Sequence, residues 1–107
     1  MSRQQILDDP ASACPQLRQF LGGYFHQDWV VERDDWQEIV RDYVSESPRS
    51  AVMECAAELR DLLAAGLGEA ELGIVLERLG GSVDPSALGQ TREEWLRAVQ
   101  ERLDAAG

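Results

Sequence analysis

The two side chains best suited to acid-base catalysis, His26 and Asp28, lie in one short stretch. His26 is the only histidine of the chain, and Asp28 follows it by two residues. A histidine and a carboxylate can act as general base and acid when a fold holds them in geometry beside a pocket. These two fall in an expected turn, and a lone histidine among aromatic residues is more often a hydrogen-bonded structural residue. We therefore expect no enzyme, and a small hydrolase that uses His26 and Asp28 is the weaker alternative.

Other catalytic and ligand-binding patterns are missing from the sequence. It contains no phosphate-binding glycine-rich loop, no nucleophile elbow and no HExxH motif. Cys14 and Cys55 are far apart, and neither a CxxC pair nor a second histidine completes a set of metal ligands. A free cysteine commonly behaves as a small buried hydrophobe. We expect no cofactor, no metal and two structural thiols.

Aromatic residues gather around the same stretch. Five of the seven lie within residues 20–36, namely Phe20, Tyr24, Phe25, Trp29 and Trp36. Exposed rings can stack on nucleotide bases, but such platforms work beside a basic groove that follows the phosphates. Residues 26–46 instead hold seven acids against two arginines. We therefore expect most of these rings to form a packing centre in the core.

The charge balance excludes several classes of partner. The chain has 20 Asp and Glu residues, 10 arginines and no lysine, which gives a formal net charge of -10. A surface of this sign repels nucleic acid and anionic lipid. The N-terminal residues show no apolar signal region, and no apolar run is long enough to cross a bilayer. We expect a cytoplasmic protein that binds a basic protein partner, and neither nucleic acid nor a membrane.

Carboxylates recur at every fourth residue through one predicted helix. Asp34, Glu38, Asp42 and Glu46 have this spacing, which places them in a row on the outer face. Each like-charge pair costs about 0.2–0.5 kcal/mol, and the helix dipole disfavours an anion near the C-terminus, where Glu46 lies. Stability alone would not favour such a row. A solvated face and a surface for a basic partner both remain open, and the candidate contact residues are Asp28, Glu32, Asp34, Glu38, Asp42 and Glu46.

Apolar periodicity predicts the helices that must position these residues. The expected ranges are about 15–25, 36–46, 48–66, 69–79 and 92–103. Asp35, Ser47 and Thr91 are expected caps, Pro48 is the expected first residue of its helix, and Gly80 is expected to end a helix in a left-handed conformation. No segment alternates with a period of two. We predict an all-α fold, a compact bundle of four to five helices in a single domain spanning residues 1–107. Residues 1–13 form a loosely held arm or a short capping turn.

Two adjacent glycines, Gly22 and Gly23, interrupt the first of these helices. Each costs up to about 1 kcal/mol relative to alanine in a helix interior. We interpret the pair as a place where another helix approaches the backbone closely.

The run Tyr24-Phe25-His26-Gln27-Asp28-Trp29 resembles the signature of the immunity proteins of bacterial contact-dependent growth inhibition systems, the CdiI family. The resemblance begins at Leu17, continues through the helix centred on Trp36, resumes from Glu69 to Gly80 and closes on Trp95-Leu96. The chain departs from the pattern at Gly68, where a polar cap is expected, and at Val83, where an aromatic residue is frequent.

The resemblance implies a small helical protein that binds the C-terminal domain of a large surface-displayed toxin and so protects the producing cell. Such toxins are frequently nucleases, which are often basic around the site that handles polyanionic substrate. The implied partner is a basic cognate toxin domain, and the chain is expected to be a monomer or a weak homodimer. An acidic helical adaptor or regulator of another basic protein is the main alternative. The signature would be largely scaffold, comprising Tyr24, Phe25, His26, Gln27, Asp28 and Trp29.

Overall fold

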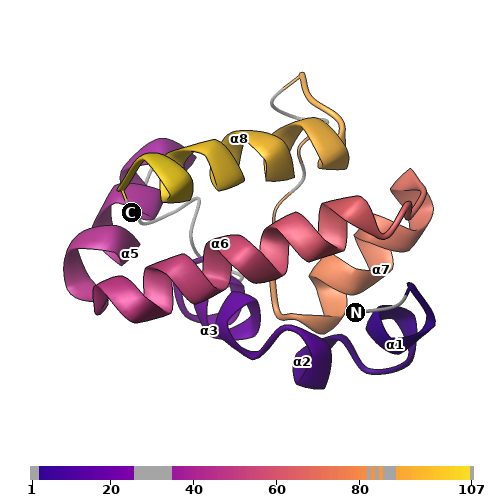
Figure 1. Ribbon diagram of the computed structural model, residues 1–107. Helices are drawn as coiled ribbons and strands as arrows, with labels where there is room; N and C mark the ends of the chain where they lie inside the picture. Colours follow the sequence, from indigo (N-terminus) through magenta and orange to yellow (C-terminus); the bar gives the residue numbers. More distant parts are fainter. Residues whose placement is uncertain (1–2, 26–34, 82, 84, 86–88, 107) are drawn as a thin grey trace.

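Helices account for the regular structure of the described chain. The computed structural model describes residues 3–25, 35–81, 83, 85 and 89–106 (Figure 1). The helices in these residues are α1 (Arg3–Asp8), α2 (Pro10–Ala13), α3 (Pro15–Tyr24), α5 (Trp36–Glu46), α6 (Arg49–Ala64), α7 (Glu69–Arg78) and α8 (Arg92–Ala106). The predicted all-α fold is confirmed, and α3, α5, α6, α7 and α8 correspond to the five predicted helices. Within these ranges, no helix has both the length and the hydrophobicity of a membrane span.

The first segment differs from the loosely held arm or short capping turn that the sequence suggested. Residues 3–13 include α1 and α2, and Ile6 is fully buried in the core. Arg3 forms an ion pair with Glu71 of α7, and Arg78 of α7 donates a hydrogen bond of 3.3 Å to the carbonyl oxygen of Leu7. Helices this short carry one or two apolar anchors and hence no periodic pattern, so tertiary contacts with α7 fix them.

α6 is the helix against which much of the fold packs. α8 runs antiparallel beside it, and α3 also packs against it (Figure 1). The stripe predicted for this helix is buried over most of its length, at Val52, Cys55, Ala56, Leu59 and Leu62. α5 lies beside the C-terminal end of α8, and α7 lies beside the N-terminal end of α8 (Figure 1). The ends of α8 are therefore held by different helices.

Aromatic rings join α3, α5 and α8 in the core. Phe25 meets Phe20 and Trp95 edge-on, with ring centroids 5.4 and 5.3 Å apart. Trp36 of α5 makes a similar contact with Trp95 at 5.9 Å. Pairs of this kind contribute about 0.5–1.5 kcal/mol beyond the burial of their area. The predicted packing centre is confirmed for these rings, whereas Trp29 lies outside the described residues.

The helix caps follow the sequence with one correction. The backbone amide of Glu94 donates to Thr91 Oγ1 at 3.0 Å, and the amide of Thr91 donates to Glu94 Oε1 at 2.8 Å, so the predicted capping box of α8 is present. Pro48 is the cap residue of α6 and not its first helical residue, and Ser47 is the C-terminal cap of α5. The extended backbone of Pro48, with ψ of 147°, keeps it outside the helix.

A close backbone approach explains one of the paired glycines. α7 ends at Arg78, and Gly80 follows its cap residue Leu79 with φ of 86°. The amide of Gly81 donates to the carbonyl of Leu76 at 3.0 Å, as in a Schellman motif. A Cβ on Gly80 would lie 3.2 Å from the Cα of Gly22. The predicted approach is confirmed at Gly22. A Cβ on Gly23 would meet no described atom within 4 Å.

Candidate protein-interaction surface

α5 carries three of the carboxylates that recur at every fourth residue, namely Glu38, Asp42 and Glu46. The side chain of Asp35 caps the helix by accepting a hydrogen bond of 2.9 Å from the backbone amide of Gln37. One face of the helix is buried through Trp36, Ile39, Val40 and Tyr43. This burial fixes the rotation of the helix about its axis, so that Glu38 and Glu46 are exposed and Asp42 is half-buried.

The structure places three of the six predicted contact residues on one helical face. These are Glu38, Asp42 and Glu46, and we call them the carboxylate row. The other three, Asp28, Glu32 and Asp34, lie outside the described residues. The same is true of the signature residues His26, Gln27 and Trp29.

Glu46 also has a partner inside the molecule, which the sequence did not reveal. The hydroxyl of Tyr24 donates a hydrogen bond of 2.7 Å to Glu46 Oε1 and so ties the end of α3 to the end of α5. This hydrogen bond, with a smaller contribution from burial, raises the pKa of Tyr24 to about 12. The ring of Tyr24 packs edge-on against Tyr43 at 5.3 Å, and Phe25 is fully buried. Two signature residues therefore pack within the fold, and a scaffold role for the whole signature stays a prediction.

A buried carboxylate on α6 was missed by sequence analysis. Glu58 is 7% exposed and accepts hydrogen bonds from the backbone amides of Leu17 at 2.9 Å and Gln16 at 3.3 Å. These amides belong to the first turn of α3, whose cap residue Cys14 makes no side-chain capping bond. An anion at this helix end also interacts favourably with the helix dipole. Glu58 therefore serves as the cap of α3 from another helix.

The sequence did contain a signal for Glu58. It follows the buried Cys55 by three residues and precedes the buried Leu62 by four, so it belongs to the apolar stripe of α6. A charged residue in such a stripe requires a partner. Burial raises the pKa of the Glu58 carboxyl, and the hydrogen bonds from the α3 amides partly oppose that shift. The site stabilises the fold.

A second carboxylate joins two helices in the same way. Glu69, the first residue of α7, accepts hydrogen bonds from the backbone amides of Arg92 at 2.8 Å and Glu93 at 3.0 Å. The side chain of Arg92 donates in return to the carbonyl of Glu69 at 3.3 Å. The start of α8 is thus capped by α7 as well as by its own capping box. Part of the acidic surplus therefore joins helices to one another, even where the carboxylate, like that of Glu69, stays exposed.

The two cysteines are free and buried. Burial raises the pKa of Cys14 to about 11 and that of Cys55 to about 12. Because the thiolate is the nucleophile and the metal ligand, thiols in this state are inert at neutral pH. In the described part of the chain, no group of three or more His, Cys, Asp or Glu side chains could hold a metal ion.

Comparisons with known proteins identify the family. A family model described as CdiI immunity protein matches residues 13–103. The structure is similar to a chain in the crystal structure of the CdiA-CT/CdiI complex from Y. kristensenii 33638, with a TM-score of 0.77 and 28% sequence identity over 85% of this chain and 98% of that chain. A search of curated protein sequences finds no match. The resemblance read from the sequence is confirmed, and the family consists of immunity proteins and not of enzymes. The chain belongs to the CdiI immunity protein family.

Proposed function

We propose that the chain binds and neutralises the C-terminal toxin domain of a cognate contact-dependent growth inhibition toxin in the cytoplasm of the cell that makes both. Membership of the CdiI immunity protein family supports neutralisation of a toxin. The similar chain of known structure comes from a complex described as CdiA-CT/CdiI, which supports direct binding as the means.

The toxin domain is, in this proposal, a nuclease with a basic surface around its active site. The net charge of -10 supports this assignment, because a protein that handles polyanionic substrate attracts an acidic inhibitor. Opposite charges raise the rate of encounter, and they do so most at low ionic strength. Added salt should therefore slow association with the toxin domain more than it speeds dissociation.

The carboxylate row is the surface that we assign to this contact. The observation that supports it is the exposure of Glu38 and Glu46, with half-buried Asp42 between them, on the side of α5 that faces away from the core. Within the row, Glu46 accepts a hydrogen bond from the Tyr24 hydroxyl, so this carboxylate also holds α3 and α5 together. We also propose that Asp28, Glu32 and Asp34 contact the toxin domain, because they precede α5 closely in the sequence.

Co-expression with the toxin domain encoded beside this chain tests the function. We expect growth to be rescued, and the two purified proteins to form a stable complex. Growth arrest in the presence of ample folded immunity protein would contradict neutralisation.

Charge reversal tests the surface separately. The double variant Glu38→Arg with Asp42→Arg should keep the fold and weaken toxin binding by at least tenfold, with a smaller dependence of the association rate on salt. The matched control is Glu54→Arg with Glu77→Arg, which alters two exposed carboxylates on α6 and α7 by the same total charge. Equal affinities of the two double variants would remove the carboxylate row from the interface.

A further inference from the structure

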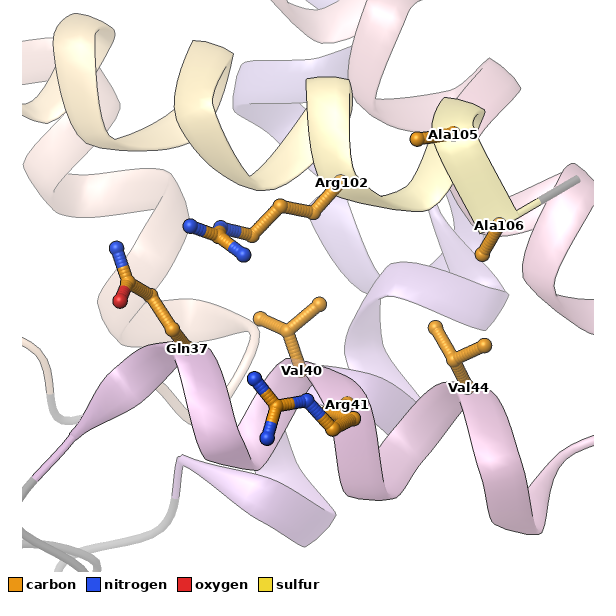
Figure 2. Close-up of a pocket in the computed structure, with 7 residues that line it drawn as sticks. All are labelled: Gln37, Val40, Arg41, Val44, Arg102, Ala105 and Ala106. Carbon is orange, nitrogen blue, oxygen red and sulfur yellow. The ribbon is translucent and has the colours of Figure 1, made fainter.

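An open pocket of about 210 Å³ lies between α5 and α8 (Figure 2). It is lined by Gln37, Val40, Arg41 and Val44 from α5 and by Arg102, Ala105 and Ala106 from α8. Its volume is below the roughly 300–1,000 Å³ that small-molecule and cofactor sites usually have. The pocket is therefore of a size for one or two protein side chains.

The two ends of the pocket differ in chemistry. Figure 2 shows the guanidinium groups of Arg41 and Arg102 at the same end as the amide of Gln37, whereas Val44 and the alanines of α8 lie at the other end. A group that filled the pocket would meet hydrogen-bond donors and positive charge on one side and an apolar wall on the other. A carboxylate beside an apolar side chain fits this arrangement.

Arg41 and Arg102 differ from several other arginines of the chain. Arg3, Arg60, Arg92 and Arg97 each form an ion pair with a carboxylate, namely Glu71, Asp104, Glu69 and Glu93 respectively. Among the described residues, no carboxylate forms such a pair with Arg41 or Arg102. The guanidinium of Arg102 instead lies over the Trp36 ring, 5.4 Å from its centroid, which orients the group and leaves its positive charge in place. The pocket is thus a cationic spot on a protein of net charge -10.

The pocket borders the carboxylate row. Successive residues turn by about 100° around a helix, so Arg41 lies about 60° from Glu38 on the surface of α5. α5 therefore carries a negative band and, next to it, a positive and apolar band. A uniformly basic partner would be attracted by the first band and repelled by the second. A partner that covers both bands needs an acidic group opposite Arg41.

We propose that the α5–α8 pocket receives one acidic side chain of the toxin C-terminal domain together with an apolar side chain beside it, and that this contact fixes the orientation of the toxin domain on α5. The inference rests on the proposed function, because its occupant is the toxin domain. A polyanion is disfavoured there by the neighbouring carboxylate row. A second copy of the chain is disfavoured because two molecules of net charge -10 repel each other.

Reversal of one charge separates this contact from general attraction to a basic partner. Arg41→Glu makes the chain more acidic, so attraction to a basic toxin domain by itself would tighten binding. The pocket proposal requires the opposite, a loss of affinity of at least tenfold, with a smaller loss in the same direction for Arg41→Gln. Arg18→Glu, which changes an exposed arginine on α3 by the same charge, is the matched control and should bind the toxin domain at least as tightly as the native chain does.

The measurement is titration calorimetry with the purified toxin domain, after thermal melts have shown that each variant is folded. Replacing the acidic residues of the toxin domain by arginine, one at a time, should identify one variant that restores tight binding to Arg41→Glu. Unchanged or tighter binding of Arg41→Glu would overturn the pocket proposal and leave the proposed function standing. Conversion of a native dimer into a monomer by Arg41→Glu, in the absence of toxin, would instead show that a second copy occupies the pocket. Failure of the native chain to bind or protect would overturn the proposed function itself.

Discussion

Replacement of Glu58 by alanine tests how the start of α3 is held. The substitution removes the acceptor for two backbone amides, that of the fully buried Leu17 at 2.9 Å and that of Gln16 at 3.3 Å. A buried donor left without a partner costs about 1–3 kcal/mol. The longer bond at the half-buried Gln16 contributes less because water can reach that amide. With the small cavity that alanine leaves, we expect a loss of about 2–4 kcal/mol in the free energy of unfolding at pH 7.

The pH dependence isolates the charge of Glu58 from its hydrogen bonds. Burial raises the pKa of this carboxyl in the folded protein, so the folded state binds the proton more tightly than the unfolded state does. The stability from this group is then fully present below the unfolded pKa of about 4.3 and is lost as the pH rises through the raised folded value. Glu58→Gln keeps one acceptor oxygen and cannot ionise. The stability of this variant relative to the native protein should therefore increase as the pH rises through that window.

Urea unfolding followed by circular dichroism between pH 4 and pH 8 measures both effects. Glu54→Ala, an exposed carboxylate on the same helix, is the control and should change stability by less than about 0.5 kcal/mol. A stability difference between Glu58→Gln and the native protein that stays constant over this pH range would refute the raised pKa. A loss below about 0.5 kcal/mol in Glu58→Ala would refute its role as the cap of α3.

Three further predictions concern Tyr24, the cysteines and Gly80. Tyr24→Phe loses the hydrogen bond to Glu46 and should lower stability by about 1 kcal/mol. Because the folded pKa of Tyr24 is raised to about 12, this stabilisation should be fully present below the unfolded pKa of about 10 and be lost as the pH rises from there through the folded value. Cys14 and Cys55 should not react with a disulfide reagent at pH 8 until the protein unfolds, because burial raises both pKa values well above that pH. Gly80→Ala should cost about 1–3 kcal/mol in urea unfolding, since the position has φ of 86° and an added methyl would press on the backbone of α3.

Each of these predictions has a contrasting measurement. Glu46→Gln should bring the ultraviolet titration of the Tyr24 phenol closer to the ordinary value near 10, and an unchanged titration would contradict the hydrogen bond. Rapid thiol labelling of the folded protein would contradict deep burial of the cysteines. At Gly23, one residue from the contact, an added methyl would meet no described atom within 4 Å. Gly23→Ala should therefore stabilise α3 by up to about 1 kcal/mol, and equal effects at Gly23 and Gly80 would contradict the close approach.

Local signals in the sequence predicted much of the fold. The capping box at Thr91 and Glu94, the glycine that ends α7 and the apolar stripe of α6 all depend on residues within a turn or two of each other, and all are present. The helices α1 and α2 were not predicted as such, because their stability depends on contacts of Ile6 and Arg3 with residues far along the chain. Short segments of that kind carry too few residues for a periodic pattern.

For the candidate site, the spacing of the carboxylates can be read from the sequence, but the contacts that each carboxylate makes depend on the tertiary structure. The spacing of Glu38, Asp42 and Glu46 places them on one face of α5 whatever surrounds the helix. The bond from Tyr24 to Glu46 and the capping of α3 by Glu58 join helices that are distant in the sequence. No local pattern contains such contacts.

By itself, the sequence determined an acidic, all-α chain with a row of carboxylates and a resemblance to immunity proteins, because composition and helical periodicity are local properties. Only the tertiary structure decided which charges face solvent, which cap a neighbouring helix, and that Arg41 and Arg102 line one pocket between α5 and α8. The physical reason is that burial and pairing depend on which helices meet, and packing of the whole core determines that.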